Sequence, residues 1–229
     1  MVFVKAQVGP ANAGDPEELF TVQYFDEQGN MTIRSGGTRA WRCNNPGNLK
    51  SSSYSTGKSR RSIGVAGVGK NLYAVYPDYE TGHEALVVMM GGSVYSPLTL
   101  RAAMQRYDEE NPKYIDEIVK ITKFDPDRTI KSLNKKEFEM FWKAIEFVEK
   151  WRVGSEDFIE KWIISGVHKK CGVISEYLVK KPEKCVWITK EQALGLAREG
   201  RLHVVIVHLK NGTQYLRPEY RTKPFGVLT

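Results

Sequence analysis

The clearest hydrophobic pattern in the chain lies between residues 134 and 151. Phe138, Trp142 and Ile145 follow one another at steps of four and three, which places them on one face of an α-helix. The next position on that face is Glu149. The pattern therefore predicts a helix whose apolar face ends in a carboxylate.

Three more helices are predicted before this one. The first begins after Asp78, a good N-cap, and stops at Gly91-Gly92. The other two carry shorter apolar patterns, and Ser96 or Thr99 lies near the start of the earlier one. The predicted helices cover 78–92, 96–108 and 111–124.

Strand patterns are shorter and lie outside these helices. Alternation of Phe20, Val22 and Tyr24 predicts a strand, a turn at 27–30 and a second strand. Residues 71–76 predict one more strand. Residues 1–17 look like an arm, and the Gly-, Ser- and Lys/Arg-rich segment 51–70 looks like a loop.

The character of the chain changes after Gly154. Short apolar runs predict strands over 172–179, 186–188 and 202–209, and Asn211-Gly212 is typical of a hairpin turn. A short helix between them begins at Thr189 and ends at Gly200. We therefore expect three regions: 1–35 (arm and β-hairpin), 36–158 (a mainly helical domain) and 159–229 (a small basic α+β domain).

Composition narrows the classes of partner. The chain has 229 residues, a net charge of +7 and a sequence pI of about 9.2. This charge favours a polyanionic partner, such as nucleic acid, an anionic membrane surface or a bacterial wall polymer, although a lysine-rich surface is often only solvated.

Export and redox signals are sparse. Residues 1–17 lack the apolar core of a signal peptide, and no apolar run is long enough to span a membrane, so we expect no classical export signal and no membrane insertion. Cys43, Cys171 and Cys185 form no metal-binding spacing. Cys171 and Cys185 either pair with each other or remain free thiols.

Several chemistries are excluded by motif. Gly64 to Lys70 fits G-x-x-x-x-G-K, but Asn71 stands where a phosphate loop needs Ser or Thr, so we expect no nucleotide site. His83-Glu84 lacks the second histidine of a zinc protease, and the four histidines are scattered. We expect no metal and no cofactor.

Two glutamates are candidate acids. Glu149 ends an apolar stripe, and apolar surroundings favour the neutral carboxyl that a general acid requires, although a residue at a helix end often extends into solvent. Glu80 lies in a first helical turn, where the helix dipole alone explains an anion. Glu146 is expected to pair with Lys150 on the surface.

The order of several motifs resembles a known family. They read "GGTRAWRCNNPGNLK", "VGKNLYAVYPDYETGHEAL", "LTLRAAMQRYDEENPKYIDEIVKITKFDPD" and "FWKAIEFVEKW". They look like the lysozyme-like "NPGN" glycosidases of phage particles and bacterial antagonism systems, over roughly Ile33 to Trp151. The motif order is similar to a circular permutation of flagellar and autolysin glucosaminidases. The chain departs from the pattern at Cys43, Trp151 and Arg152.

The resemblance implies a lysozyme-like fold and assigns roles to particular residues. Glu149 matches the glutamate of A-I-x-x-x-E and becomes the general acid, with Glu80 of E-x-G as the second candidate. The acid would act with a second carboxylate, for which we consider Glu80 and Asp78, with the substrate's acetamido group or with an attacking water. Asn45 and Asn48 would bind substrate amides beside aromatic platforms: Trp41, Tyr54, Tyr73, Tyr76 and Tyr79.

The expected function follows from the resemblance. It is a peptidoglycan glycoside hydrolase, muramidase or N-acetylglucosaminidase, acting in the periplasm of a target bacterium as a type VI secretion effector. A cognate immunity protein would occlude the cleft, and a secretion apparatus component is a further expected partner. The rival is a non-catalytic wall-binding module of a phage tail or secretion apparatus. A nucleic-acid partner is not expected, because the chain has no helix-turn-helix or zinc pattern.

Overall fold

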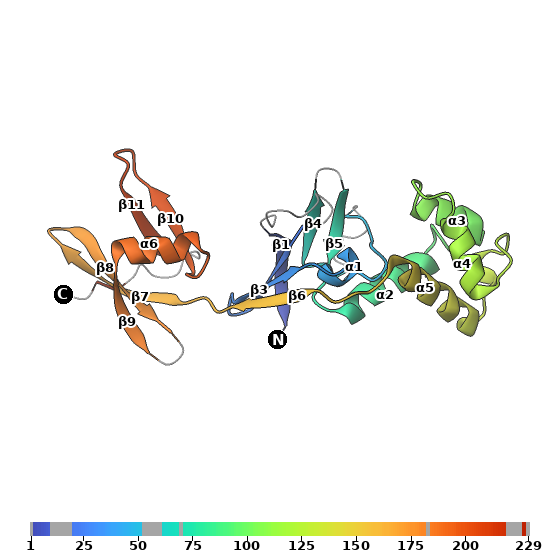
Figure 1. The fold of residues 1–229 in the computed structure, drawn as a ribbon, viewed down its shortest axis with the longest axis horizontal. Coiled ribbons are helices and arrows are strands. Elements are labelled where there is room, and N and C mark those ends of the chain that lie inside the picture. The colour runs from blue at the N-terminus through green and yellow to red at the C-terminus, as the bar shows by residue number, and fades with distance from the viewer. Residues whose placement is uncertain are drawn as a thin grey trace. The chain divides into compact units, whose positions relative to one another are not determined.

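The computed structural model describes residues 2–9, 20–51, 61–68, 71–181, 184–218 and 226–227. The chain divides into two compact units (Figure 1). The first unit comprises Met1–Glu27 and Thr32–Asp157, and the second comprises Gln28–Met31 and Phe158–Thr229.

The first unit contains a six-stranded mixed sheet. Its strand order is β5-β4-β1-β2-β3-β6. β1 runs antiparallel to β2 and parallel to β4, and β4 forms an antiparallel pair with β5. The strands are β1 (Phe3–Val8), β2 (Val22–Asp26), β3 (Met31–Ser35), β4 (Gly64–Val68), β5 (Asn71–Val75) and β6 (Ser155–Ile159).

This sheet corrects the expected fold class. The chain is α+β, but it is not mainly helical with a small β-hairpin region: about a third of the described residues lie in strands, a similar share lie in helices, and a six-stranded mixed sheet stands where only a hairpin was expected. The arm contains β1 and the expected loop contains β4. Gly64 sits so close to Ala6 that an added Cβ would lie 1.9 Å from its carbonyl oxygen. A strand that depends on such a distant partner carries little local signal.

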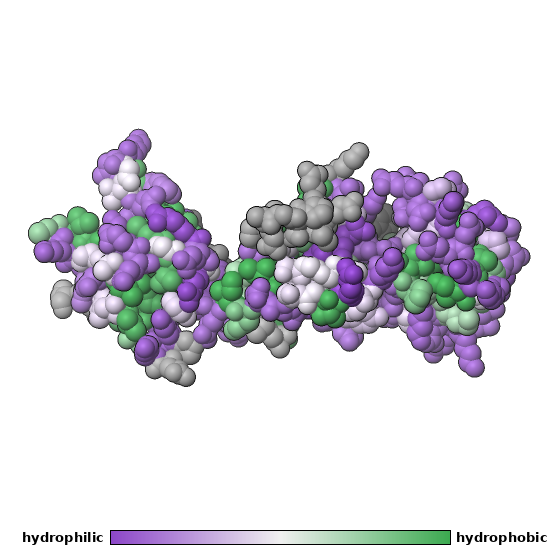
Figure 2. All heavy atoms as spheres, in the orientation of Figure 1, coloured by the Kyte–Doolittle hydropathy of each residue, from purple (hydrophilic) through white to green (hydrophobic). Residues whose placement is uncertain are grey.

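Helices form the rest of the first unit. The four predicted helices are confirmed, and a short helix and a 3₁₀ turn are added to them. In chain order they are α1 (Arg39–Arg42), α2 (Tyr79–Gly91), α3 (Leu100–Tyr107), α4 (Tyr114–Thr122), η2 (Ile130–Ser132) and α5 (Lys135–Glu149). Asp78 caps α2 and Thr99 caps α3, each by accepting a backbone N–H. Apolar side chains are exposed on α4 and α5, where Figure 2 shows hydrophobic surface.

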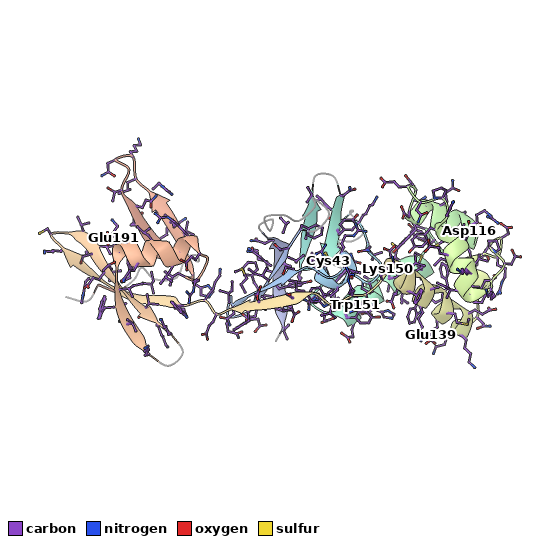
Figure 3. The ribbon with its side chains drawn as sticks, in the orientation of Figure 1. Cys43, Asp116, Glu139, Lys150, Trp151 and Glu191 are labelled. Carbon is purple, nitrogen blue, oxygen red and sulfur yellow. The ribbon has the colours of Figure 1, made fainter. Side chains whose placement is uncertain are left out.

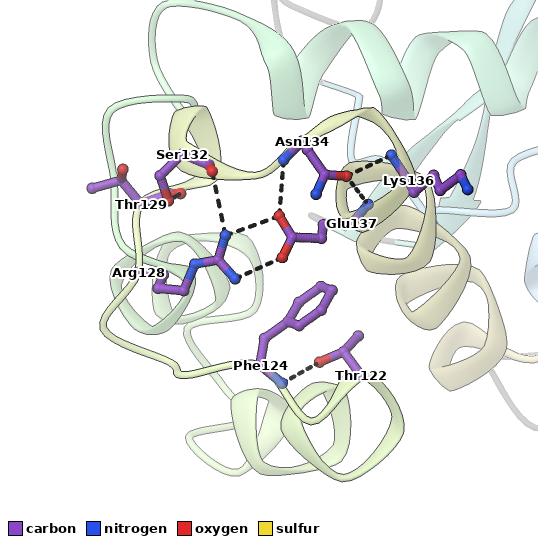
Figure 4. Close-up of polar contacts among 8 residues, drawn as sticks. All are labelled: Thr122, Phe124, Arg128, Thr129, Ser132, Asn134, Lys136 and Glu137. Carbon is purple, nitrogen blue, oxygen red and sulfur yellow. Dashed lines mark hydrogen bonds and ion pairs between the residues drawn. The ribbon is translucent and has the colours of Figure 1, made fainter.

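α5 has a well-defined beginning (Figure 4). The Asn134 side chain accepts the backbone N–H groups of Lys136 and Glu137, and Glu137 accepts that of Asn134, which makes a capping box. Arg128 donates to both Glu137 oxygens at 2.9 Å. The Arg128 guanidinium and the Asn134 N–H together hold the pKa of Glu137 down at about 2. The start of the helix is therefore fixed.

β5 separates two hydrophobic cores in the first unit. Tyr73 and Val75 face a core of the sheet, whereas Ala74 and Tyr76 face a core of the helices. The segment 38–49 joins both cores, since Cys43 packs in the first and Leu49 in the second. The polar NPGN segment thus lies where the two cores meet.

The second unit is built on two smaller sheets and one helix. The larger sheet has the order β12-β7-β8-β9, and the smaller pairs β10 with β11. α6 contacts both sheets. Its elements are β7 (Ile163–Lys170), β8 (Val173–Lys180), β9 (Cys185–Thr189), α6 (Lys190–Arg198), β10 (Val204–His208), β11 (Gln214–Pro218) and β12 (Gly226–Val227). Thr189 caps α6 as predicted, and Gly200 (φ 72°) follows its C-terminus.

Candidate active site around Glu149

The NPGN segment follows the one-turn helix α1. Thr38 caps this helix with its side chain. After the helix, the Asn48 N–H donates to the Asn45 carbonyl at 2.8 Å, which closes a tight turn over Pro46 and Gly47. The turn predicted at Pro46-Gly47 is confirmed.

Asn44 and Asn45 hold the turn in place. Asn45 is fully buried, and its amide donates to the carbonyls of Leu49 and Ala74 at 3.0 Å each while accepting the Leu49 N–H at 2.9 Å. Asn44 donates to the Tyr76 carbonyl at 3.1 Å. The structure therefore gives Asn45 a place in the core rather than on a surface that a substrate reaches.

Asn48 has a different position. It is partly exposed, has left-handed backbone geometry (φ 47°), and directs its side chain away from the turn. Its Nδ2 donates to Glu149 Oε2 at 2.6 Å, and its Oδ1 accepts from Arg39 Nε at 3.1 Å. Because an arginine can only donate, this second bond fixes which end of the amide faces Glu149.

Glu149 reaches this place from the end of α5. Lys150 (φ 60°) stops the helix, and the following chain returns to the start of α1, where the Thr38 N–H donates to the Arg152 carbonyl at 2.9 Å. An added Cβ at Gly37 would lie 2.5 Å from that carbonyl oxygen, so this approach requires glycine. Figure 3 labels Lys150 and Trp151 at this turn.

Two tyrosines complete the surroundings of Glu149. Tyr114, the first residue of α4, donates its hydroxyl to Glu149 Oε1 at 2.8 Å. Tyr107, the last residue of α3, donates to the Gly47 carbonyl, and its ring meets Tyr114 edge-on at 5.5 Å. The helical part and the NPGN turn are thus bonded to each other around one carboxyl.

The surroundings of Glu149 raise its pKa on balance. Burial raises the pKa of Glu149, and the negative charge of Asp108 adds to the rise. The hydrogen bonds from Asn48 and Tyr114 and the charge of Arg39 lower it, but burial outweighs them. Burial and Glu149 itself also raise the pKa of Tyr114, so this phenol stays a hydroxyl.

The two oxygens of Glu149 are not equivalent. Oε2 faces an amide that can only donate, so a proton there would meet another proton. Oε1 faces the Tyr114 hydroxyl, which can turn to donate or accept. The neutral carboxyl therefore carries its proton on Oε1.

The other candidate carboxylates lie elsewhere. Glu80 is exposed in the first turn of α2. Burial and Glu146 are the main causes of the raised pKa of Tyr79, and the charge of Glu80 adds to them. Asp78 is used as the cap of α2 and accepts the Thr81 N–H at 2.7 Å. The structure therefore brings together Glu149 and Asn48 but not Glu80.

The predicted aromatic platforms differ in access. Trp41, Tyr73 and Tyr76 are buried and offer no open ring face. Arg39 lies 3.9 Å from the centre of the Tyr73 ring. Tyr79 is exposed, at 37%, and Tyr54 falls outside the described residues.

Sequence reasoning missed roles for Arg39, Tyr107 and Tyr114. Both tyrosines belong to the motif "RYDEENPKYI", which joins two predicted helices. Two tyrosines on either side of this junction were the sequence feature that could have indicated their role. Arg39 gave no signal, because its contacts to Asn48 and Tyr73 depend on how the chain folds back.

The cysteines and the possible metal ligands of the described residues were also considered as functional groups. Burial raises the pKa of the Cys43 thiol to about 12, which makes it unreactive. Cys171 and Cys185 are exposed free thiols. Within the described ranges, no cluster of His, Cys, Asp or Glu could hold a metal ion, and no helix is long and apolar enough to cross a membrane.

Comparison with known proteins adds no assignment. No protein-family model matches the chain, and no curated protein matches it. The functional argument therefore rests on the geometry around Glu149 and on the motif resemblance.

Proposed function

We propose that the first unit is a glycoside hydrolase that cleaves the glycan backbone of peptidoglycan, with Glu149 as the general acid. The observation that carries this proposal is the state of Glu149. It is a partly buried carboxyl with a raised pKa, oriented by an amide from the NPGN turn and a hydroxyl from α4. A general acid needs this combination of a raised pKa and a fixed direction.

The reaction requires a proton at the glycosidic oxygen. Glu149 donates the proton held on Oε1 to that oxygen as the C–O bond breaks and the leaving sugar departs as an alcohol, and Asn48 keeps the resulting carboxylate in place through Oε2. A water molecule then adds to the anomeric carbon of the oxocarbenium-like state, and a carboxylate of the site accepts its proton. Burial is the main cause of the raised pKa of Glu149, and the charge of Asp108 adds to it, so Asp108 is a further candidate for the second carboxylate beside Glu80 and Asp78. The substrate's acetamido group is the alternative source of stabilisation.

The biological setting is part of the same proposal. The motif resemblance supports peptidoglycan as substrate and delivery by a type VI secretion system into the periplasm of a target bacterium. A cognate immunity protein that covers the Glu149 region is the expected partner.

The alternative is a wall-binding module without catalysis. One observation favours it: both oxygens of Glu149 already have protein hydrogen bonds, as in a purely structural carboxyl. Such a protein would bind sacculi and release nothing.

Digestion of purified sacculi tests both functions. Wild type, Glu149→Gln and the matched control Glu80→Gln are compared by mass analysis of the released muropeptides. We expect disaccharide products from wild type and Glu80→Gln and a loss of at least 100-fold, about 2.7 kcal/mol, with Glu149→Gln. The reducing-end sugar identifies the linkage.

Two results would contradict the hydrolase. Loss of activity in Glu80→Gln alone would move the acid to α2. Sedimentation with sacculi without any product from wild type would support the binding module instead.

A further inference from the structure

A second group of fixed side chains lies one helical turn before Glu149. Glu146 of α5 accepts from His83 Nδ1 at 2.7 Å through Oε1 and from the Tyr79 hydroxyl at 2.9 Å through Oε2. Sequence analysis paired Glu146 with Lys150, and that expectation is wrong, because α2 packs against this face of α5. Both α2 side chains are thus held by one carboxylate.

These contacts order a row of four rings. Tyr79 stacks with His83 at 5.9 Å and meets the edge of Trp151 at 4.9 Å, while His83 meets Trp142 edge-on at 4.3 Å. The row therefore joins α2, α5 and the turn after α5. We call it the aromatic row: Tyr79, His83, Trp142 and Trp151.

The row is accessible at one end and polar along its edge. Tyr79 and Trp151 are exposed, at 37% and 38%, and the His83 side chain is 26% exposed. Glu146 accepts from His83 Nδ1, and His83 Nε2 has no hydrogen-bonding partner among the described residues. A ligand would meet ring faces together with a fixed ring nitrogen and a fixed hydroxyl.

We propose that the aromatic row is a sugar-binding subsite that stacks against a pyranose ring of the glycan. This inference rests on the proposed hydrolase function and extends it to how the substrate is held. The ring occupying the row belongs to the same chain whose glycosidic oxygen receives the proton of Glu149.

Continuity along α5 supports the placement. Glu146 and Glu149 are three residues apart, which is about 4.5 Å along a helix axis. Trp151 follows Glu149 by two residues, at the turn that brings the carboxyl to Asn48 (Figure 3). Trp151, where the chain departs from the family pattern, is thus part of the proposed subsite.

The chemistry of the row selects a neutral ligand. Glu146 contributes a negative charge at its centre, and Glu80 acts on Tyr79 from α2. The only cation over one of these rings, among the described residues, is Lys143, 5.4 Å from the Trp142 ring centre and paired with Glu139. A phosphate or nucleic acid would be repelled, whereas a sugar offers an apolar face and hydroxyls. Rings that are already held in place lose little entropy when they bind it.

The test separates binding from catalysis by working in the Glu149→Gln protein. Sedimentation with purified sacculi and titration with a soluble N-acetylglucosamine tetramer are measured for Trp151→Ala, Trp151→Phe and Phe147→Ala. Phe147 is the matched control, since it is an aromatic residue of α5, 74% exposed and outside the row.

We expect Trp151→Ala to weaken binding about tenfold, or about 1.4 kcal/mol. Trp151→Phe should recover part of this loss, and Phe147→Ala should bind within about twofold of the parent. Equal binding by Trp151→Ala and Phe147→Ala, with near-ultraviolet spectra showing both folded, would overturn the subsite.

Kinetics with otherwise wild-type protein distinguish this failure from failure of the proposed function. If wild type releases muropeptides and Trp151→Ala leaves KM unchanged, the subsite is wrong and the hydrolase stands. A raised KM with kcat retained supports the subsite. If wild type releases nothing, the hydrolase fails, and the binding titration alone decides whether the row holds sugar.

Discussion

The two units keep their polar residues in different places. The first unit has equal numbers of basic and acidic residues, 21 of each, and buries several polar side chains among its described residues: Thr21, Asp26, Thr32, Arg42, Asn44, Asn45 and Thr122. The second unit has 13 basic and 6 acidic residues, which equals the whole net charge of +7. Among its described residues, none of the fully buried side chains is a charged, amide or Ser/Thr group.

The two units differ in whether they bury polar side chains. Burying polar groups costs free energy unless each is hydrogen-bonded, so a unit retains them only where they fix something. In the first unit, Asn44 and Asn45 hold the NPGN turn, from which Asn48 bonds to Glu149, while Thr122 bonds within α4. The second unit has an apolar core that includes Tyr177 and Leu216, and its charged side chains lie outside that core.

The largest effect is expected from Asn45→Ala. It removes an amide that satisfies three buried backbone groups of the first unit, and we expect a loss of about 2–4 kcal/mol in free energy of unfolding. Tyr177→Phe, which removes the acceptor of the Leu216 N–H in the second unit, should cost about 1 kcal/mol. Urea denaturation combined with hydrogen exchange measures the free energy of unfolding of both variants. Equal losses would show that buried polar groups are no more important to the first unit than to the second.

Glu149→Gln should stabilise the protein at pH 7. The folded pKa of Glu149 is raised, so its contribution to stability is present below the unfolded pKa and lost as pH rises through the folded value. For each pKa unit by which the folded value is raised, the variant should gain about 1.4 kcal/mol in free energy of unfolding at pH 7. The gain should vanish below about pH 4, whereas the exposed Glu80→Gln should change stability by less than about 0.5 kcal/mol at both pH values.

Charge reversal in the second unit should weaken binding to sacculi. Lys169 and Lys170 are exposed at the end of β7, and the double change to Glu removes positive charge that attracts anionic wall groups. In the Glu149→Gln protein we expect about tenfold weaker sedimentation at low salt and little difference in 0.5 M NaCl. The control is the double variant Lys135→Glu, Lys136→Glu in the first unit. An equal loss of binding in the control would show that the second unit does not contribute more to wall binding than the first.

Asn134→Ala should have the smallest effect. It deletes the cap of α5 and should cost about 1 kcal/mol, measured by thermal unfolding. Because Glu149 lies at the opposite end of α5, the pH profile of activity should not move. A shifted profile would show that the acid depends on the whole helix rather than on Asn48 and Tyr114.

Local signals explain what the sequence predicted. The caps Asp78 and Thr189 are encoded within a few residues, and both are confirmed. The apolar stripe of α5 is confirmed in part, since Ile145 is buried whereas Phe138 and Trp142 are only partly buried. Glu149 was found because it continues that stripe. Its partner Asn48 is 101 residues away and lay in a recognisable motif, but the bond between them has no local pattern.

Distant pairing explains what was missed. β1 pairs with β4, which is far from it in the sequence, so neither strand shows the pattern of a local hairpin. The two glycines of β4, Gly64 and Gly67, also lower its predicted strand propensity. Glu146 had a ready partner one turn away in Lys150, yet packing of α2 supplied His83 and Tyr79. Short-range pairing rules cannot include a helix whose position comes from the tertiary fold.

The most direct test of the central claim joins the ionisation of Glu149 to the activity. The carboxyl pKa is measured by ¹³C NMR from the difference between wild type and Glu149→Gln, and the pH dependence of muropeptide release is measured on the same preparation. The account predicts a pKa above the ordinary glutamate range and a rate that falls as pH rises through that same value, with both moving upward in Tyr114→Phe, which loses a donor to the carboxylate. A Glu149 that titrates in or below the ordinary range, or a rate that does not follow its ionisation, would contradict it.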